Sequence, residues 1–355
     1  MKIIMLNAKG LAIALIGAVL ANYLNIPLPW LLGPLLAALF MGSLGKPLSC
    51  HPHWRKGGQI IIGMALGLYF TPALVQAISA YWGLILLGIL WSLLLGTLLA
   101  VMQYRINALD WATAWFSSAI GSASEMVNIA EQYNAQVDKV VAAHSLRIII
   151  LVVLIPIFMG FYFQIDWTTL VVLETERYGF IQVILLSVLA LYAGKLFQYF
   201  NLLNAWILGP LTIIGFFSFV GFLPLRFPDW FIALGQLCIG WSLGSKFPFS
   251  FLKNNKKFIG LTFLFNLFAL GLSIIFALVL FYLSDADAKI LILGLSPGGI
   301  AEMSLMAKVM GLAVPIVVAF QLSRLIFVIL TTRFFYLSSL KLILKRINRS
   351  KDIDH

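Results

Sequence analysis

Residues 296–303 read Ser-Pro-Gly-Gly-Ile-Ala-Glu-Met, and residues 121–126 read Gly-Ser-Ala-Ser-Glu-Met. The Gly, Glu and Met that the two stretches share are 177 positions apart. Each stretch places a carboxylate beside helix-breaking Gly, Ser or Pro in a chain that is otherwise strongly apolar. Irregular backbone at membrane depth is tolerated only where it is buried in protein or lines a cavity. The two stretches therefore predict a pair of broken helices around a cavity.

The composition places the rest of the chain in a lipid bilayer. Of the 355 residues, 62% are hydrophobic and 10% are charged, and the mean hydropathy is +1.01. A soluble domain is about 45–50% apolar and about 25% charged, so a soluble enzyme is excluded. A helix that spans the bilayer needs about 20 apolar residues. The apolar runs occupy 10–24, 27–44, 57–79, 81–103, 137–163, 178–200, 203–222, 228–249, 258–283 and 313–337.

Further matches in nearly the same register show that the chain is a duplication. Pro29-Trp30-Leu31-Leu32-Gly33-Pro34 matches Ala205-Trp206-Ile207-Leu208-Gly209-Pro210; Gln59, Gly63 and Gly67 match Gln236, Gly240 and Gly244; and Arg147 matches Arg324. Self-similarity at a fixed spacing is the signature of an internal repeat. Small residues four positions apart are typical of close helix packing. The Gln and Trp-Gly-Pro elements are interpreted mainly as packing elements, with the glutamines reaching the cavity as the alternative.

The distribution of basic residues predicts that the two copies are inverted. The net charge is +11, and Lys and Arg gather in short gaps between apolar runs and in the tail at 341–351. This pattern is typical of cytoplasmic loops, so we expect no nucleic-acid partner. The basic gap of the first half is 46–56, whereas that of the second half lies one gap later, at 246–257. Positive charge has moved to the opposite side of the equivalent helix, as expected for inverted repeats.

Inversion requires an odd number of crossings in each half. The mixed stretches 108–133 and 285–311 are therefore predicted to enter and leave the membrane on one side. The predicted fold is an all-α polytopic membrane protein with about ten transmembrane helices in two inverted repeats, each with a broken or re-entrant hairpin. The domain prediction is a first repeat at 10–163, a polar linker at 164–177, a second repeat at 178–337 and a basic cytoplasmic tail at 338–355. We expect both termini to be cytoplasmic.

Glu125 and Glu302 are the first candidates for binding a substrate or ion. An ionisable group at membrane depth is costly and normally faces a cavity or a partner. The adjacent glycines, Gly121, Gly298 and Gly299, free backbone groups and helix ends that can hold an ion or a solute near the bilayer midplane. The alternative is a carboxylate at a water-exposed hairpin tip, or one paired purely for stability.

Arg147 and Arg324 are the candidate partners of these carboxylates. Each lies roughly ten residues into its final helix, which at 1.5 Å per residue is about 15 Å deep. They could pair with Glu302 and Glu125, bind an anionic substrate through a guanidinium fork, or form structural ion pairs. His144 lies one turn before Arg147, where the second copy has Gln321. That histidine is either a proton relay or a polar core residue.

Metal and nucleotide chemistry find no support in the sequence. Four histidines and two cysteines, Cys50 and Cys238, do not provide a ligand set with metal-site spacing. A Walker-type phosphate loop is absent from the sequence, which argues against an ATP-driven pump. We therefore expect no metal, no cofactor and no catalytic constellation.

Together, the duplicated Trp-Leu/Ile-Leu-Gly-Pro, Gln-x3-Gly-x3-Gly and Pro-Gly-Gly-x2-Glu-Met elements and the later Arg resemble the AbrB family of duplicated bacterial inner-membrane proteins. The resemblance extends from about residue 10 to residue 337. Members of that family have been described as transporters, as ammonia monooxygenases and as regulators of gene expression. The first copy departs from the family pattern, because Ile120-Gly121-Ser122 stands where Pro-Gly-Gly is expected.

The residues discriminate among these descriptions. A monooxygenase needs metal ligands that the sequence lacks, and a direct transcription factor needs a soluble DNA-binding module. The expected function is secondary-active transport of a small, anionic organic solute coupled to protons or sodium, with the glutamates binding the coupling ion. The alternative is a membrane sensor that binds the same ligand and regulates gene expression indirectly. The expected partners are the solute, the coupling ion and the lipid bilayer, and a homo-oligomer is left open.

Overall fold

The computed structural model describes residues 2–26, 28–72, 79–121, 123–164, 179–202, 204–223, 226–245 and 254–353. Within these ranges every regular secondary-structure element longer than a single residue is a helix. The first half contains α1 (Lys2–Tyr23), α2 (Pro29–Ser43), α3 (Pro52–Gly67), α5 (Trp82–Arg105), α6 (Trp111–Ser118), α7 (Ala123–Gln132) and α8 (Val137–Phe163). The second half contains α9 (Phe180–Tyr199), α10 (Ala205–Phe219), α11 (Asp229–Ser245), α13 (Lys256–Leu283), α14 (Ala288–Leu295), α15 (Ile300–Val309) and α16 (Val314–Ile353).

Five of the described helices are long and apolar enough to cross a bilayer: α5, α8, α9, α13 and the Val314–Lys341 part of α16. Shorter apolar helices occupy Lys9–Tyr23, Pro29–Ser43 and Ala205–Phe219. Large hydrophobic side chains are exposed along these helices, as at Leu94, Phe161 and Leu330. Exposed apolar surface on this scale fits contact with lipid rather than with water. The chain is therefore a helical membrane protein.

The backbone repeats its unusual conformations at the spacing of the sequence repeat. Positive φ angles occur at Asn25 and Asn201 (51° and 53°), at Leu28 and Asn204 (50° and 46°), and at Gly45 and Gly221 (76° and 81°). Each pair is 176 residues apart. Left-handed backbone is uncommon for residues other than glycine, so its recurrence at matched positions shows that the two copies turn between helices in the same way.

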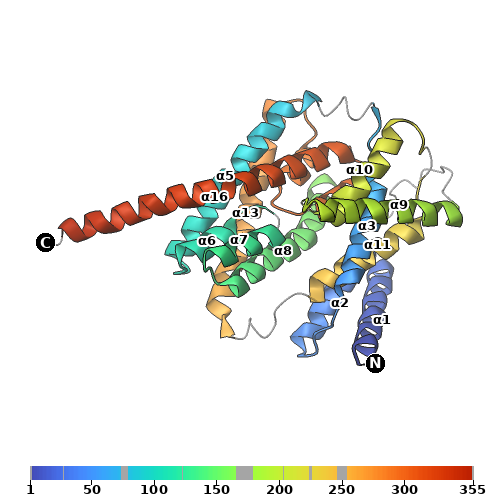
Figure 1. The fold of residues 1–355 in the computed structure, drawn as a ribbon, viewed down its shortest axis with the longest axis horizontal. Coiled ribbons are helices and arrows are strands. Elements are labelled where there is room, and N and C mark those ends of the chain that lie inside the picture. The colour runs from blue at the N-terminus through green and yellow to red at the C-terminus, as the bar shows by residue number, and fades with distance from the viewer. Residues whose placement is uncertain are drawn as a thin grey trace.

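Each half contributes helices to both of two bundles. We call α1–α3 with α9–α11 the first bundle, and α5–α8 with α13–α16 the second bundle. Within the first bundle α3 packs on α10 and α11 packs on α2, so the halves exchange partners. The main direct contacts between the bundles are those of α15 with α3 and of α11 with α8. Figure 1 shows the first bundle on one side of the molecule and α5–α8 with α13 on the other.

The small residues of α3 and α11 permit this exchange. A Cβ atom added to Gly63 would lie 2.5 Å from the carbonyl oxygen of Ile207 on α10. At the matching Gly240 a Cβ atom would overlap the carbonyl oxygen of Leu31 on α2. The backbones approach this closely only because glycine has no side chain. The predicted packing role of the Gln-x3-Gly-x3-Gly elements is confirmed.

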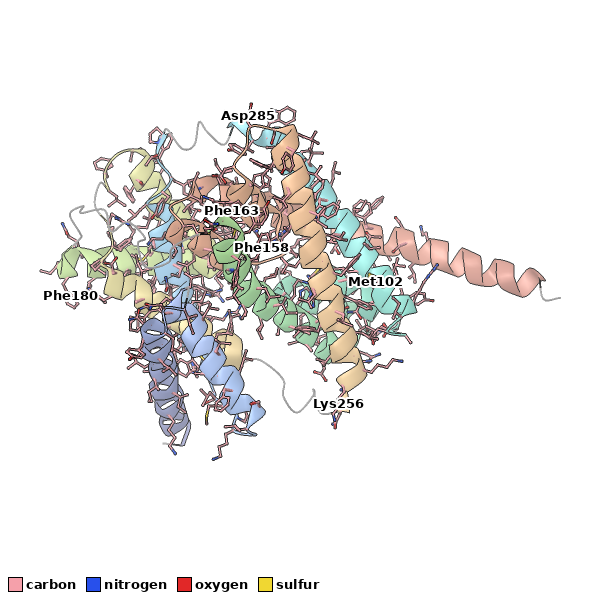
Figure 2. All side chains as sticks on the ribbon, turned by 180° about the vertical axis from the view of Figure 1, so that it is seen from behind. Met102, Phe158, Phe163, Phe180, Lys256 and Asp285 are labelled. Carbon is pink, nitrogen blue, oxygen red and sulfur yellow. The ribbon has the colours of Figure 1, made fainter. Side chains whose placement is uncertain are left out.

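The two mixed stretches form the predicted broken helices. Residues 108–133 contain α6 and α7, which are interrupted between Ser118 and Ala123, and residues 285–311 contain α14 and α15, which are interrupted between Leu295 and Ile300. Both broken helices belong to the second bundle, where the long helix α13 packs against α14 and α8. Figure 2 shows α13 extending from Lys256 to the end near Asp285.

α16 continues into the predicted basic tail at 338–355, as far as Ile353. Figure 1 shows this end of α16 projecting away from the bundles. The polar linker at 164–177 lies outside the described residues except for Gln164, and so do Lys246 and Lys253 of the basic cluster.

Candidate functional site

The break in the first hairpin is held by Arg147. The end of α6 leaves carbonyl groups without helical partners. The Arg147 guanidinium, 4% exposed, reaches them from α8. Its Nη1 donates to Ala119 O at 2.9 Å, and its Nη2 donates to Ser117 O at 2.9 Å and to Ser118 O at 3.1 Å. A cation at a helix C-terminus also interacts favourably with the helix dipole, so this arginine stabilises the broken backbone.

Arg324 holds the break in the second hairpin in the same way. It is also 4% exposed, and its Nη1 donates to Ser296 O at 2.7 Å. Its Nη2 donates to Gly298 O at 2.7 Å and to Gln321 Oε1 at 2.7 Å. In the described structure the hydrogen bonds of both arginines therefore go chiefly to hairpin backbone, whereas the sequence left pairing with Glu125 and Glu302 open.

His144 and Gln321 fill one role in the two copies. His144 Nε2 lies 2.9 Å from Phe116 O, and Gln321 Nε2 donates to Leu293 O at 2.7 Å. Because a carbonyl oxygen only accepts, the histidine carries its proton on Nε2. Phe116 and Leu293 are 177 residues apart, so the two side chains support the same turn. These contacts favour the polar core interpretation of His144 over the proton relay.

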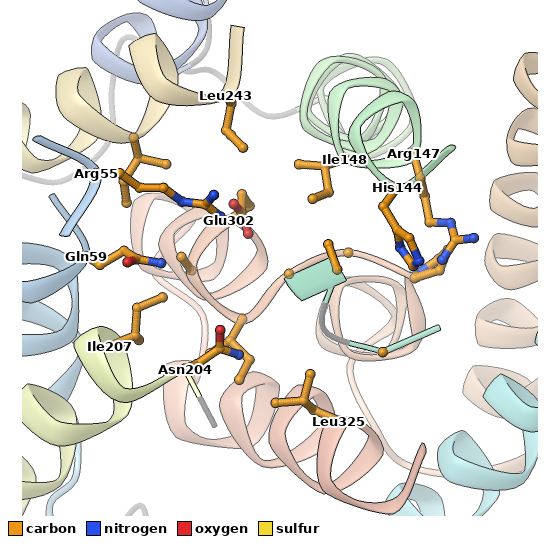
Figure 3. Close-up of a pocket in the computed structure, with 18 of the residues that line it drawn as sticks. Arg55, Gln59, His144, Arg147, Ile148, Asn204, Ile207, Leu243, Glu302 and Leu325 are labelled. Atoms are coloured by element: carbon orange, nitrogen blue, oxygen red, sulfur yellow. The ribbon is translucent and has the colours of Figure 1, made fainter. Parts of the chain in front are cut away.

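A cavity lies between the two bundles at the hairpin breaks. Its volume is about 80 Å³, which is enough for several water molecules, since one needs about 10–15 Å³ on this measure. Its polar lining comes from both bundles: Arg55 and Gln59 of α3, Asn204 before α10, and Glu302 and Arg324 of the second bundle. Figure 3 shows Arg55, Gln59 and Asn204 along one side and His144 and Arg147 on the other.

Glu302 is the carboxylate of this cavity. It is 8% exposed and lies in the first turn of α15, where the positive end of the helix dipole favours a negative charge. Its carboxylate folds back over Gly299, because a Cβ atom added there would overlap Glu302 Oε2. Figure 3 shows the Arg55 guanidinium and the Glu302 carboxylate pointing toward one another across the cavity.

The structure separates the predicted site residues into two groups. The predicted site residues that line the cavity are Gly121, His144, Arg147, Gly298, Gly299, Glu302 and Arg324. Glu125 and Gln321 do not line it. Glu125 lies in the first turn of α7 and is partly exposed. The two glutamates that match in the sequence therefore have different surroundings.

Arg55 and Asn204 were not predicted as site residues. Arg55 belongs to the basic gap at 46–56, which was interpreted only as a signal of membrane topology. In the structure it lies in the first turn of α3, one helical turn before Gln59. Residues at i and i+4 share a helix face, and this spacing is the sequence signal that could have identified Arg55. Asn204 lies at the left-handed start of α10, and no comparable spacing in the sequence identifies it as a cavity residue.

One buried donor in the cavity wall is unused. Within the described part of the chain, Arg324 Nε is buried without a hydrogen-bond partner. In the first copy Arg147 Nε donates to Asn266 Oδ1 at 3.2 Å. Buried polar groups are normally satisfied, so the second break retains an unused donor that the first break does not have.

Comparison with known proteins agrees with the family resemblance found in the sequence. A family described as "Transition state regulatory protein AbrB" matches residues 30–338. The protein named "Uncharacterized protein YhjN" from Bacillus subtilis (strain 168) is 23% identical over 351 residues, covering 92% of this chain and 91% of that protein. The protein named "Putative regulator AbrB" from Escherichia coli (strain K12) is 23% identical over 313 residues, covering 86% of this chain and 88% of that protein. No solved structure matches the chain.

Proposed function

The chain belongs to the AbrB family, and we propose that it is a secondary-active transporter of a small organic anion, coupled to protons or sodium. The proposed activity is transport without chemical conversion of the solute. The observation that carries the proposal is the cavity between the two bundles, in which a buried carboxylate, Glu302, faces a cation, Arg55, at the break of a helix. Broken helices around a central site are typical of transporters.

The charges in the cavity suggest how the ion and the solute are coupled. With Glu302 ionised, Arg55 faces a negative partner, and an added anion would meet repulsion from the carboxylate. A proton or sodium ion on Glu302 removes that repulsion, and Arg55 is then available to bind the carboxylate of the solute. The cation and the solute then bind favourably together. This arrangement corresponds to symport.

The proposed topology has ten crossings in two inverted repeats, with re-entrant hairpins and both termini in the cytoplasm of the bacterial plasma membrane. Three observations support this topology. Left-handed residues recur at matched positions, α3 packs on α10 of the other half as α11 packs on α2, and the basic gaps lie on opposite sides of the equivalent helix. In this topology three residues that line the central cavity, Arg55, Asn204 and Leu243, lie near the cytoplasmic ends of their helices. The structure then corresponds to an inward-facing state.

Flux measurements in proteoliposomes test the proposal. The full chain is reconstituted with inward gradients of protons or of sodium, and uptake of radiolabelled monocarboxylates and dicarboxylates is compared with that of Glu302→Gln and Arg55→Gln. Glu125→Gln is the matched control, because it makes the same change at the equivalent position outside the cavity. Gradient-dependent uptake that both cavity variants abolish supports the proposal. Uptake that survives in both variants would place the site elsewhere.

The alternative function is a membrane sensor, which the name of the Escherichia coli relative, "Putative regulator AbrB", favours. In this case the solute binds in the same cavity but does not cross the bilayer, and any regulation of gene expression is indirect. A ligand that raises the melting temperature of the purified protein, loses that effect in Arg55→Gln and shows no flux would favour the sensor.

A further inference from the structure

A second cavity lies at the other end of α15. Its volume is about 350 Å³, and it is lined by Tyr69 and Thr71 after α3, Ser218 of α10, Arg226 and Phe227 before α11, and Lys308 of α15. Lys308 follows Glu302 by six residues, which at 1.5 Å per residue places it about 9 Å along the helix. The cavity is therefore separate from the central one, and it also spans the boundary between the two bundles.

Two cations converge on this cavity. Arg226 donates a hydrogen bond to the Tyr69 hydroxyl, and Lys308 Nζ lies 6.0 Å from the centre of the Tyr69 ring. Among the described residues, the charges of Arg226 and Lys308 repel one another, and Asp229 offsets that repulsion at Lys308 only in part. Repulsion between like charges is strong where the surroundings are partly buried, so the cavity as built favours an added negative charge.

A hydroxyl group adds to this lining. Thr71 borders the same cavity, whereas Ser218 gives its one hydroxyl proton to Leu68 O at 3.0 Å and forms part of the wall without donating to an anion. Arginine, lysine and hydroxyl donors are the groups that recognise carboxylate and phosphate oxygens. Their origin matters: Lys308 comes from the second bundle, whereas Arg226, Tyr69 and Ser218 come from the first.

We propose that this cavity is a second anion-binding site, in which Arg226 and Lys308 hold one oxyanion group, a carboxylate or a phosphate, between the two bundles. The site is independent of the transport proposal, since it shares no charged residue with the central cavity. The oxyanion belongs either to a water-soluble anion or to the headgroup of an anionic lipid. Because the anion bridges the bundles, it stabilises this arrangement of the two.

The experiment measures thermal unfolding of the purified full chain in detergent with increasing inorganic phosphate or succinate, at constant ionic strength. We expect a saturable rise in melting temperature, and about a tenfold or larger loss of apparent affinity in Lys308→Gln and Arg226→Gln, because a charge-assisted hydrogen bond is removed. Lys308→Arg keeps the charge and is expected to retain binding, which separates loss of the site from loss of folding.

Two controls decide the outcome. Lys289→Gln makes the same charge change on α14, outside the cavity, and should leave the apparent affinity unchanged; an equal loss there would overturn the proposal. Glu302→Gln should abolish transport and leave this binding intact.

For the lipid source, native mass spectrometry measures phosphatidylglycerol retained by the wild type and by Lys308→Gln. If neither soluble anions nor this lipid bind in a way that depends on Lys308 and Arg226, the proposal is wrong.

Discussion

The two broken helices share their supports but differ in the groups that face the cavity. In both copies an arginine from the following helix holds the carbonyl groups at the break, and His144 or Gln321 holds the preceding turn. Only in the second copy does the glutamate face the cavity and Arg55. The comparison indicates that the supports maintain the shape of both hairpins, whereas the binding chemistry is concentrated in one of them.

The most severe test of this difference is the exchange of either glutamate for glutamine. Glu302→Gln removes the carboxylate that faces Arg55, and we expect uptake in proteoliposomes to fall by about 100-fold or more, which corresponds to about 2.8 kcal/mol. Glu125→Gln lies outside the cavity and should leave uptake within about twofold of the wild type, because a substitution away from the cavity groups usually has a small effect. Equal losses in the two variants would show that both hairpins carry the function.

Replacing each arginine by lysine separates support from binding. Arg147→Lys loses most of four hydrogen bonds in a buried site, and we expect a loss of stability of about 3 kcal/mol, since bonds to charged groups are worth about 1.5–3 kcal/mol each. Arg324→Lys loses three bonds and already has an unused Nε, so its stability loss should be smaller and its effect on uptake larger. Thermal unfolding and flux on the same preparations measure both, and a reversed order would contradict the comparison.

The glycines at the breaks provide a milder test. In Gly299→Ala the new Cβ atom overlaps Glu302 Oε2, so the carboxylate must move, and we expect about a tenfold fall in uptake, equivalent to about 1.4 kcal/mol. In Gly121→Ala the nearest atoms are Met126 Cε at 3.2 Å and Val328 Cγ1 at 3.3 Å, both at side-chain ends that can shift. Uptake by this variant should change little, and a loss as large as that of Gly299→Ala would argue against the special role of Glu302.

The smallest effect is expected from making the two supports identical. His144→Gln gives the first copy the side chain of the second, and its amide can donate to Phe116 O as Gln321 does to Leu293 O. We expect a stability change of about 1 kcal/mol or less, the scale of one neutral hydrogen bond. The dependence of uptake on pH should remain that of the wild type. A shifted pH profile would instead identify His144 as a proton relay.

The sequence predicts the two helix breaks well and the cavity only in part. Gly121 and Ser122 in the first copy, and Ser296 to Gly299 in the second, mark the breaks, because Gly, Ser and Pro weaken a helix locally. The same local signals present Glu125 and Glu302 as equivalent, which the structure does not bear out. The difference arises from Arg55, whose matching position carries Ile232. Its position opposite Glu302 results from packing between the bundles, which no local pattern records, and the same holds for Asn204.

The exchange of partners between the halves has a consequence for the timing of synthesis. The glycine face of α3 at Gly63 packs on Ile207 of α10, and the two residues are 144 positions apart. At about 5–20 residues per second, a ribosome needs roughly 7 to 30 seconds to reach α10 after α3 is made. During that interval the glycine face of α3 lacks its permanent neighbour, α10. In the nascent first half this face must therefore contact lipid or the insertion machinery until α10 is inserted.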